Sequence, residues 1–123
     1  MEPVKDKAMI PTKVHGYLDY MMGLILILLP FLMKFPGGAA TWLPVILGVG
    51  ALGYSMLTDY ELGLIRIISM RTHLAIDLFS GILLLVGPWI FGFAEEVFWP
   101  FVILGLLEIG AALMTRKTVR YVI

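Results

Sequence analysis

The chain has 123 residues, of which 60% are hydrophobic and only 15% are charged, against about 25% charged residues in soluble domains. Its mean hydropathy is +0.96, and nine Lys plus Arg balance nine Asp plus Glu. These values indicate a protein of the lipid bilayer without the basic excess that nucleic acid requires, and the lack of cysteine excludes disulfides and Cys-ligated metal sites.

Four apolar segments follow one another along the chain, at about residues 11–33, 44–58, 72–91 and 98–115. Each is long enough to cross, or nearly cross, a hydrocarbon core of about 30 Å as a helix. Helices are expected because every backbone group in lipid must be paired internally. Pro44 and Pro100 are predicted to lie at the starts of the second and fourth helices, where a proline loses no hydrogen bond.

The positive charges predict how the chain is oriented. Eight of the nine Lys and Arg lie before or at the start of the first span, between the second and third spans, or after the fourth, and only Lys34 lies elsewhere. The positive-inside rule therefore predicts that both termini are cytoplasmic, and we expect a multi-pass protein of the inner membrane. The predicted parts are a cytoplasmic arm (1–10), a first helix pair (11–58), a cytoplasmic interfacial loop (59–71), a second pair (72–115) and a cytoplasmic tail (116–123).

The two helix pairs are tandem repeats. At an offset of 58, six residues recur unchanged, and at an offset of 57 the sequence VILG recurs at 102–105. The six residues are His15, Asp19, Gly23, Leu26, Pro30 and Phe35, with the counterparts His73, Asp77, Gly81, Leu84, Pro88 and Phe93. Because each repeat holds two spans, both copies share one orientation, and a pseudo-two-fold axis along the membrane normal is expected.

The end of the third segment carries a family resemblance. The sequence GPWIFGF at 87–93 resembles the SPW repeat of small bacterial integral membrane proteins, with Gly87 in place of Ser and with Pro88 and Trp89 retained. The first copy is more divergent and reads LPF around Pro30. The resemblance implies a bacterial membrane location and a two- or four-span architecture, and it implies no reaction.

A polar triplet lies on the first helix of each repeat. His15, Asp19 and Gly23 are spaced four residues apart, so they share one helix face. His73, Asp77 and Gly81 have the same spacing. The four His and Asp side chains are expected to meet near the pseudo-axis on the cytoplasmic side.

The second helix of each repeat presents small residues suited to close packing in a membrane. The glycines predicted to pack in this way are Gly48, Gly53, Gly105 and Gly110, and Gly23 and Gly81 on the first helices are also predicted to pack closely against another helix. Glu108 replaces Ala51 on this face, so we expect it beside the His/Asp cluster rather than toward lipid.

Four interpretations of the cluster remain open from the sequence. It is a structural network that locks the helices, a metal site of two His and two carboxylates, a bis-histidine haem site, or a proton or ion relay that includes Glu108. No cofactor is predicted outright. No nucleophile–base arrangement is visible, so a structural or accessory membrane protein is favoured over an enzyme, with lipid and a second copy or another membrane protein as partners. Residues 58–72 are predicted to form an interfacial amphipathic turn or helix.

Overall fold

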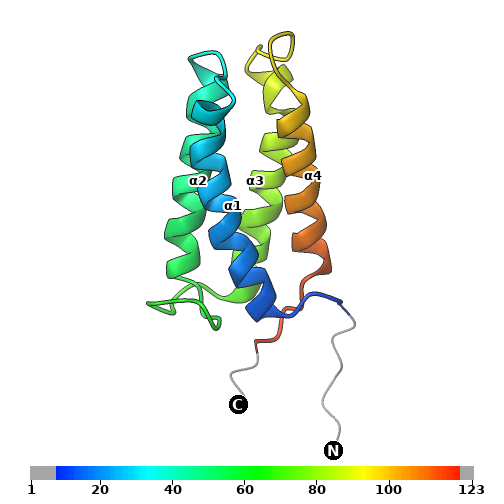
Figure 1. Ribbon diagram of the computed structural model, residues 1–123. Coiled ribbons are helices and arrows are strands. Elements are labelled where there is room, and N and C mark those ends of the chain that lie inside the picture. Colours follow the sequence, from blue (N-terminus) through cyan, green and yellow to red (C-terminus); the bar gives the residue numbers. More distant parts are fainter. Residues whose placement is uncertain (1–7, 120–123) are drawn as a thin grey trace, which may run out of the picture.

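The computed structural model describes residues 8–119, and this part of the chain folds into four helices joined as two antiparallel hairpins (Figure 1). They are α1 (Thr12–Leu32), α2 (Ala39–Met56), α3 (Met70–Ile90) and α4 (Trp99–Met114). The prediction of an all-helical protein is confirmed. The predictions for residues 1–7 and 120–123 fall outside the described residues.

Three of the four helices have the length of membrane spans, and all four have an apolar surface. α1, α2 and α3 are each long and apolar enough to cross a membrane, whereas α4 has 16 residues and is shorter. Large apolar side chains are exposed on all four helices, such as Leu28, Ile46, Phe79 and Leu113. An apolar exterior of this kind is costly in water and is matched by lipid.

Within each hairpin, glycines bring the two backbones together. A Cβ atom on Gly48 would lie 2.7 Å from the carbonyl oxygen of Gly23, and one on Gly105 would lie 2.7 Å from that of Gly81. Such close approach is how helices pack in lipid, where no hydrophobic force drives them together. Gly53 and Gly110, for which the same packing was expected, face open space.

The start of the second helix differs from the one expected. α2 begins at Ala39 rather than near Pro44, so this proline lies inside the helix. Gly38, with a φ of 76°, starts the helix by accepting the N–H groups of Thr41 and Trp42. Pro100, as expected, lies in the first turn of α4. The earlier start of α2 is allowed because a membrane helix tolerates an internal proline when neighbouring groups pair with the freed carbonyl.

The two ends of the bundle differ in character. At the end with the short 33–38 and 91–98 loops, an apolar core joins both hairpins. This core contains Leu26, Leu43, Leu84, Phe93 and Phe101. The opposite end carries the 57–69 loop together with the segments that flank the first and last helices (Figure 1), and the polar cluster lies toward this end.

The 57–69 loop forms turns without a helix. Leu64, Ile65 and Ile67 are exposed, as an interfacial anchor requires. Tyr60, by contrast, is completely buried and packs with Met70 and Leu74. One part of this loop therefore belongs to the core and not to the surface.

Candidate functional site

The four polar residues of the two triplets converge in the interior. His15 and Asp19 come from α1 and His73 and Asp77 from α3, and all four are buried. His15 Nε2 lies 2.7 Å from Asp77 Oδ2 and 3.0 Å from Asp19 Oδ1. His73 Nε2 lies 2.9 Å from Asp19 Oδ2 and 3.1 Å from Asp77 Oδ2. Each histidine is thus closer to the aspartate of the other repeat than to the one on its own helix.

A threonine fixes the far side of each ring. Thr115 Oγ1 donates to the carbonyl of Ala111 at 2.5 Å, and it lies 2.7 Å from His15 Nδ1. Thr58 Oγ1 donates to the carbonyl of Tyr54 at 2.7 Å, and it lies 2.6 Å from His73 Nδ1. Because a hydroxyl has one hydrogen, each threonine accepts from the ring, and so each Nδ1 carries a proton.

Two tyrosines complete the shell around the carboxylates. The Tyr60 hydroxyl donates to Asp19 Oδ2 at 2.7 Å, and the Tyr54 hydroxyl donates to Asp77 Oδ1. Burial and the Asp19 carboxylate raise the pKa of the Tyr60 phenol above its usual value, so this hydroxyl keeps its proton and remains a donor.

With both aspartates ionised, two states of the Nε2 atoms fit these contacts. If they hydrogen-bond the carboxylates, both rings donate from both nitrogens and are imidazoliums, which balance the two aspartates. If the Nε2 atoms are unprotonated, their lone pairs and the carboxylate oxygens would repel one another unless both bind a cation between them. His73 Nε2 is buried without a well-aligned hydrogen bond among residues 8–119, although two carboxylate oxygens lie near it. One ligand atom from each of the four residues lies within 4.8 Å of all the others.

The backbone contacts beside the two histidines recur in both repeats. The amide of Ile10 donates to the carbonyl of Met114 at 3.0 Å, and Ile68 donates to Leu57 at 2.8 Å. The amide of Arg116 then donates back to Ile10 at 2.9 Å, as Asp59 does to Ile68 at 2.7 Å. These partners are separated by the same 57 or 58 residues as the repeats.

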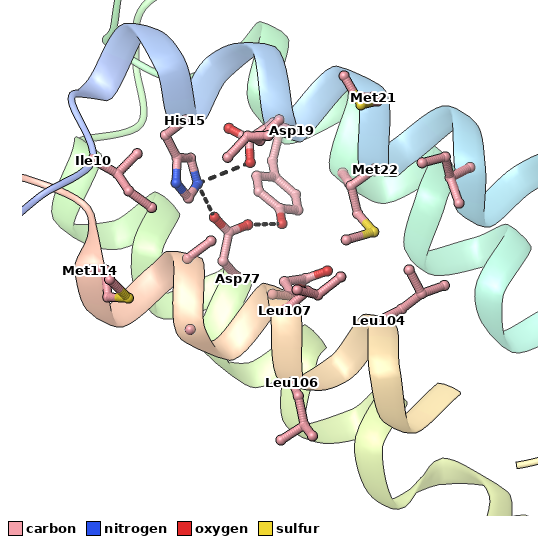
Figure 2. A pocket seen from close by; sticks show the side chains of 17 residues that line it. Ile10, His15, Asp19, Met21, Met22, Asp77, Leu104, Leu106, Leu107 and Met114 are labelled. Atoms are coloured by element: carbon pink, nitrogen blue, oxygen red, sulfur yellow. Dashed lines mark hydrogen bonds and ion pairs between the residues drawn. The ribbon is translucent and has the colours of Figure 1, made fainter. Parts of the chain in front are cut away.

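The fifth candidate, Glu108, lies beside the cluster without joining its hydrogen bonds. It is 8% exposed and lines a cavity of about 450 Å³, which His15, Asp19 and Asp77 also line. Figure 2 shows His15 between Asp19 and Asp77 at the polar end of this cavity, with apolar side chains of α1 and α4 around the rest.

The family comparison agrees with this architecture. The family model described as the SPW repeat domain matches residues 13–115, which cover both hairpins and every residue of the cluster. The chain belongs to the SPW repeat family. No curated protein and no solved structure is significantly similar to the chain.

The motif that gives the SPW repeat its name lies away from the cluster. Pro88 is buried near the end of α3, and the Trp89 side chain is 57% exposed. Pro30 occupies the matching position in α1 and is also buried. The carbonyls of Pro30 and Pro88 accept the amides of Phe35 and Phe93 at 2.8 Å, so the motif shapes the outer turn of each repeat.

Four residues of the site were missed by the sequence reasoning: Tyr54, Thr58, Tyr60 and Thr115. A signal existed for the threonines, because Thr58 recurs as Thr115 at the same offset of 57 as VILG. Tyr54 has no such signal, since its counterpart is Ala111, and the surface pattern around Tyr60 masks its burial.

Substituting Thr115 with valine tests the assigned ring protonation. Thr115→Val keeps the side-chain shape and removes the acceptor of His15 Nδ1–H, at a cost of about 1 kcal/mol in the free energy of unfolding. We expect ¹⁵N spectra of histidine-labelled protein to show two rings with protonated Nδ1, of which one shifts in Thr115→Val and the other in Thr58→Val. A neutral ring protonated only on Nε2 contradicts the assignment.

Proposed function

We propose that this SPW repeat protein is a four-span structural or accessory protein of the bacterial inner membrane whose His/Asp cluster fastens its two repeats to one another. The observation that carries the proposal is that the closest contacts of each histidine join one repeat to the other. Each histidine takes both its threonine and its nearer aspartate from the other repeat. Such bonds fix the register of two hairpins that otherwise touch mainly through α2 and α3.

The proposal includes the arrangement of the repeats and their orientation. The recurrence of backbone and side-chain contacts at offsets of 57 and 58 supports a pseudo-two-fold axis along the membrane normal. Both termini are cytoplasmic, because eight of the nine cations lie on that side. We include α4 as the fourth span because it packs closely against α3, as α1 does against α2.

The exposed apolar part of the 57–69 loop supports an accessory role at the cytoplasmic face. Leu64, Ile65 and Ile67 project from the loop, where they reach the headgroup region or a partner membrane protein. The protein has no catalysis of its own in this account. The two histidine rings are 5.4 Å apart between centroids and meet edge to face, which leaves no room for a haem between them.

A second candidate, a divalent metal centre, is favoured by the convergence of four ligand atoms and by the poorly aligned His73 Nε2. Two neutral His and two Asp suit zinc or a similar ion. A metal-bound histidine usually donates its other ring N–H to an acceptor that fixes the ring, and the threonine hydroxyls could act in this way here. The distances of 2.7–3.1 Å between Nε2 and carboxylate atoms are those of hydrogen bonds, so the ion-paired cluster ranks first.

Metal analysis with stability measurements separates the two candidates. The intact protein is purified in detergent without chelator, its metal content is measured, and Co²⁺ is then titrated as a spectroscopic probe. The structural account predicts a colourless protein that binds no stoichiometric metal and that loses thermal stability in His15→Ala and His73→Ala. About one ion per chain, lost in both variants, would make the cluster a metal centre and would refute the purely structural account.

A further inference from the structure

The seam between α1 and α4 is open, unlike its counterpart between α2 and α3. α2 and α3 pack against each other, whereas α1 and α4 are not among the closely packed helix pairs. The cavity of about 450 Å³ lies along this open seam. Several of its lining side chains are also exposed on the helix exterior, including Leu18, Met21, Leu107 and Met114, so the groove opens sideways toward lipid.

Two differences between the repeats create this groove. In the first repeat, Tyr54 packs its ring 4.9 Å from that of His73 and donates to Asp77, which closes the seam. The counterpart of Tyr54 at an offset of 57 is Ala111, which lines the groove. The counterpart of Ala51 at the same offset is Glu108. The second repeat therefore has a small side chain where the first repeat has the Tyr54 ring, and a carboxyl group where the first repeat has the Ala51 methyl group.

The Glu108 carboxyl group lacks a partner in the described part of the chain. No hydrogen bond or ion pair joins it to any of residues 8–119, although only 8% of the residue is exposed. The two imidazoles are already engaged by two aspartates, and no Lys or Arg among residues 8–119 lines the groove. Burying a carboxyl group without a partner costs free energy. A ligand that brings a hydrogen-bond donor and a positive charge to this group therefore binds more favourably than one that brings neither.

We propose that the α1–α4 groove binds a hydrophobic amine from the membrane, with Glu108 as the partner of its ammonium group. The apolar walls hold the body of the molecule, and the groove has the size of a small-molecule site. Met21, Met22 and Met114 supply adaptable contacts. Anions are disfavoured because the two imidazoles are already paired with Asp19 and Asp77, which leaves the Glu108 carboxyl group without a cation beside it among residues 8–119. The site does not depend on whether the cluster holds a metal.

A matched series of three probes tests the proposal on the full-length protein in lipid nanodiscs. The probes are 4-phenylbutylamine, 4-phenylbutanol and 4-phenylbutyrate, which share one apolar body. Binding is measured by calorimetry with empty nanodiscs subtracted. We expect saturable binding of the amine at one per chain, roughly tenfold or more tighter than the alcohol, and no saturable binding of the acid. Absence of saturable amine binding, or equal affinity for the alcohol, overturns the proposal.

Variants locate the binding. Glu108→Gln keeps the side-chain size and is expected to abolish the preference for the amine over the alcohol. Ala111→Tyr places in the groove the aromatic side chain that the first repeat has at Tyr54, and it is expected to remove binding of both the amine and the alcohol. Glu95→Gln, an exposed carboxyl group in the 91–98 loop, serves as the matched control and leaves binding unchanged. Circular dichroism melts verify folding of each variant, and amine binding that survives Glu108→Gln in folded protein refutes the assigned site.

Discussion

Replacing Asp77 with asparagine is expected to lower the free energy of unfolding by about 3 kcal/mol, because breaking one side of a buried ion-pair network leaves the other charges uncompensated. Asp77 accepts from Tyr54 and lies next to both histidines. Asparagine has the same shape but only one acceptor oxygen, and its NH₂ group faces the imidazolium protons.

The loss is measured by titrating the protein from mixed micelles into SDS while following helix content. Glu96→Gln is the matched control, since this carboxyl group is exposed in the 91–98 loop and its neutralisation should change stability by less than about 0.5 kcal/mol. A value for Asp77→Asn as small as the control's would mean that the cluster does not hold the fold.

Adding a single methyl group at Gly105 is expected to cost about 2 kcal/mol of stability, within the usual range for overpacking. The Cβ of alanine would lie 2.7 Å from both the Gly81 carbonyl oxygen and the Leu85 amide nitrogen. Both atoms belong to the α3 backbone, so neither can yield by changing a rotamer, and α3 and α4 must separate.

The equivalent substitution at Gly53 provides the control. A Cβ atom there meets nothing within 4 Å, and alanine favours the helix by up to about 1 kcal/mol over glycine. We expect Gly53→Ala to unfold at the same or a higher SDS fraction than the wild type, and Gly105→Ala at a lower one. Equal midpoints for the two variants would show that close backbone contact between α3 and α4 is absent.

Sequence reasoning captured the features that depend on periodicity. Apolar length gave the helices, and spacing of four residues placed His15 with Asp19 and His73 with Asp77 on matching faces. It also marked the glycines at which the helices touch as packing residues, without pairing them, because small residues at a helical period favour close helix packing in lipid.

Features that depend on contacts between distant segments could not be predicted in this way. The burial of Tyr60 requires the 57–69 loop to fold back onto α1, which its alternating polar and apolar residues do not indicate. The open α1–α4 seam follows from the small Ala111 at the position equivalent to Tyr54. The offset of 57 pairs these two residues in the sequence, but the sequence does not show that Tyr54 packs against His73 and Asp77. The start of α2 depends on backbone geometry at Gly38.

The central claim, that the cluster couples the two repeats, is tested most directly by a double-mutant cycle between His15 and Asp77, which belong to different repeats. His15→Ala, Asp77→Ala and the double variant are compared with the wild type by SDS unfolding. The account predicts a coupling energy of about 1–3 kcal/mol, as for residues within one buried network. Single effects that add to within about 0.5 kcal/mol would show that the two side chains do not interact and would contradict the account.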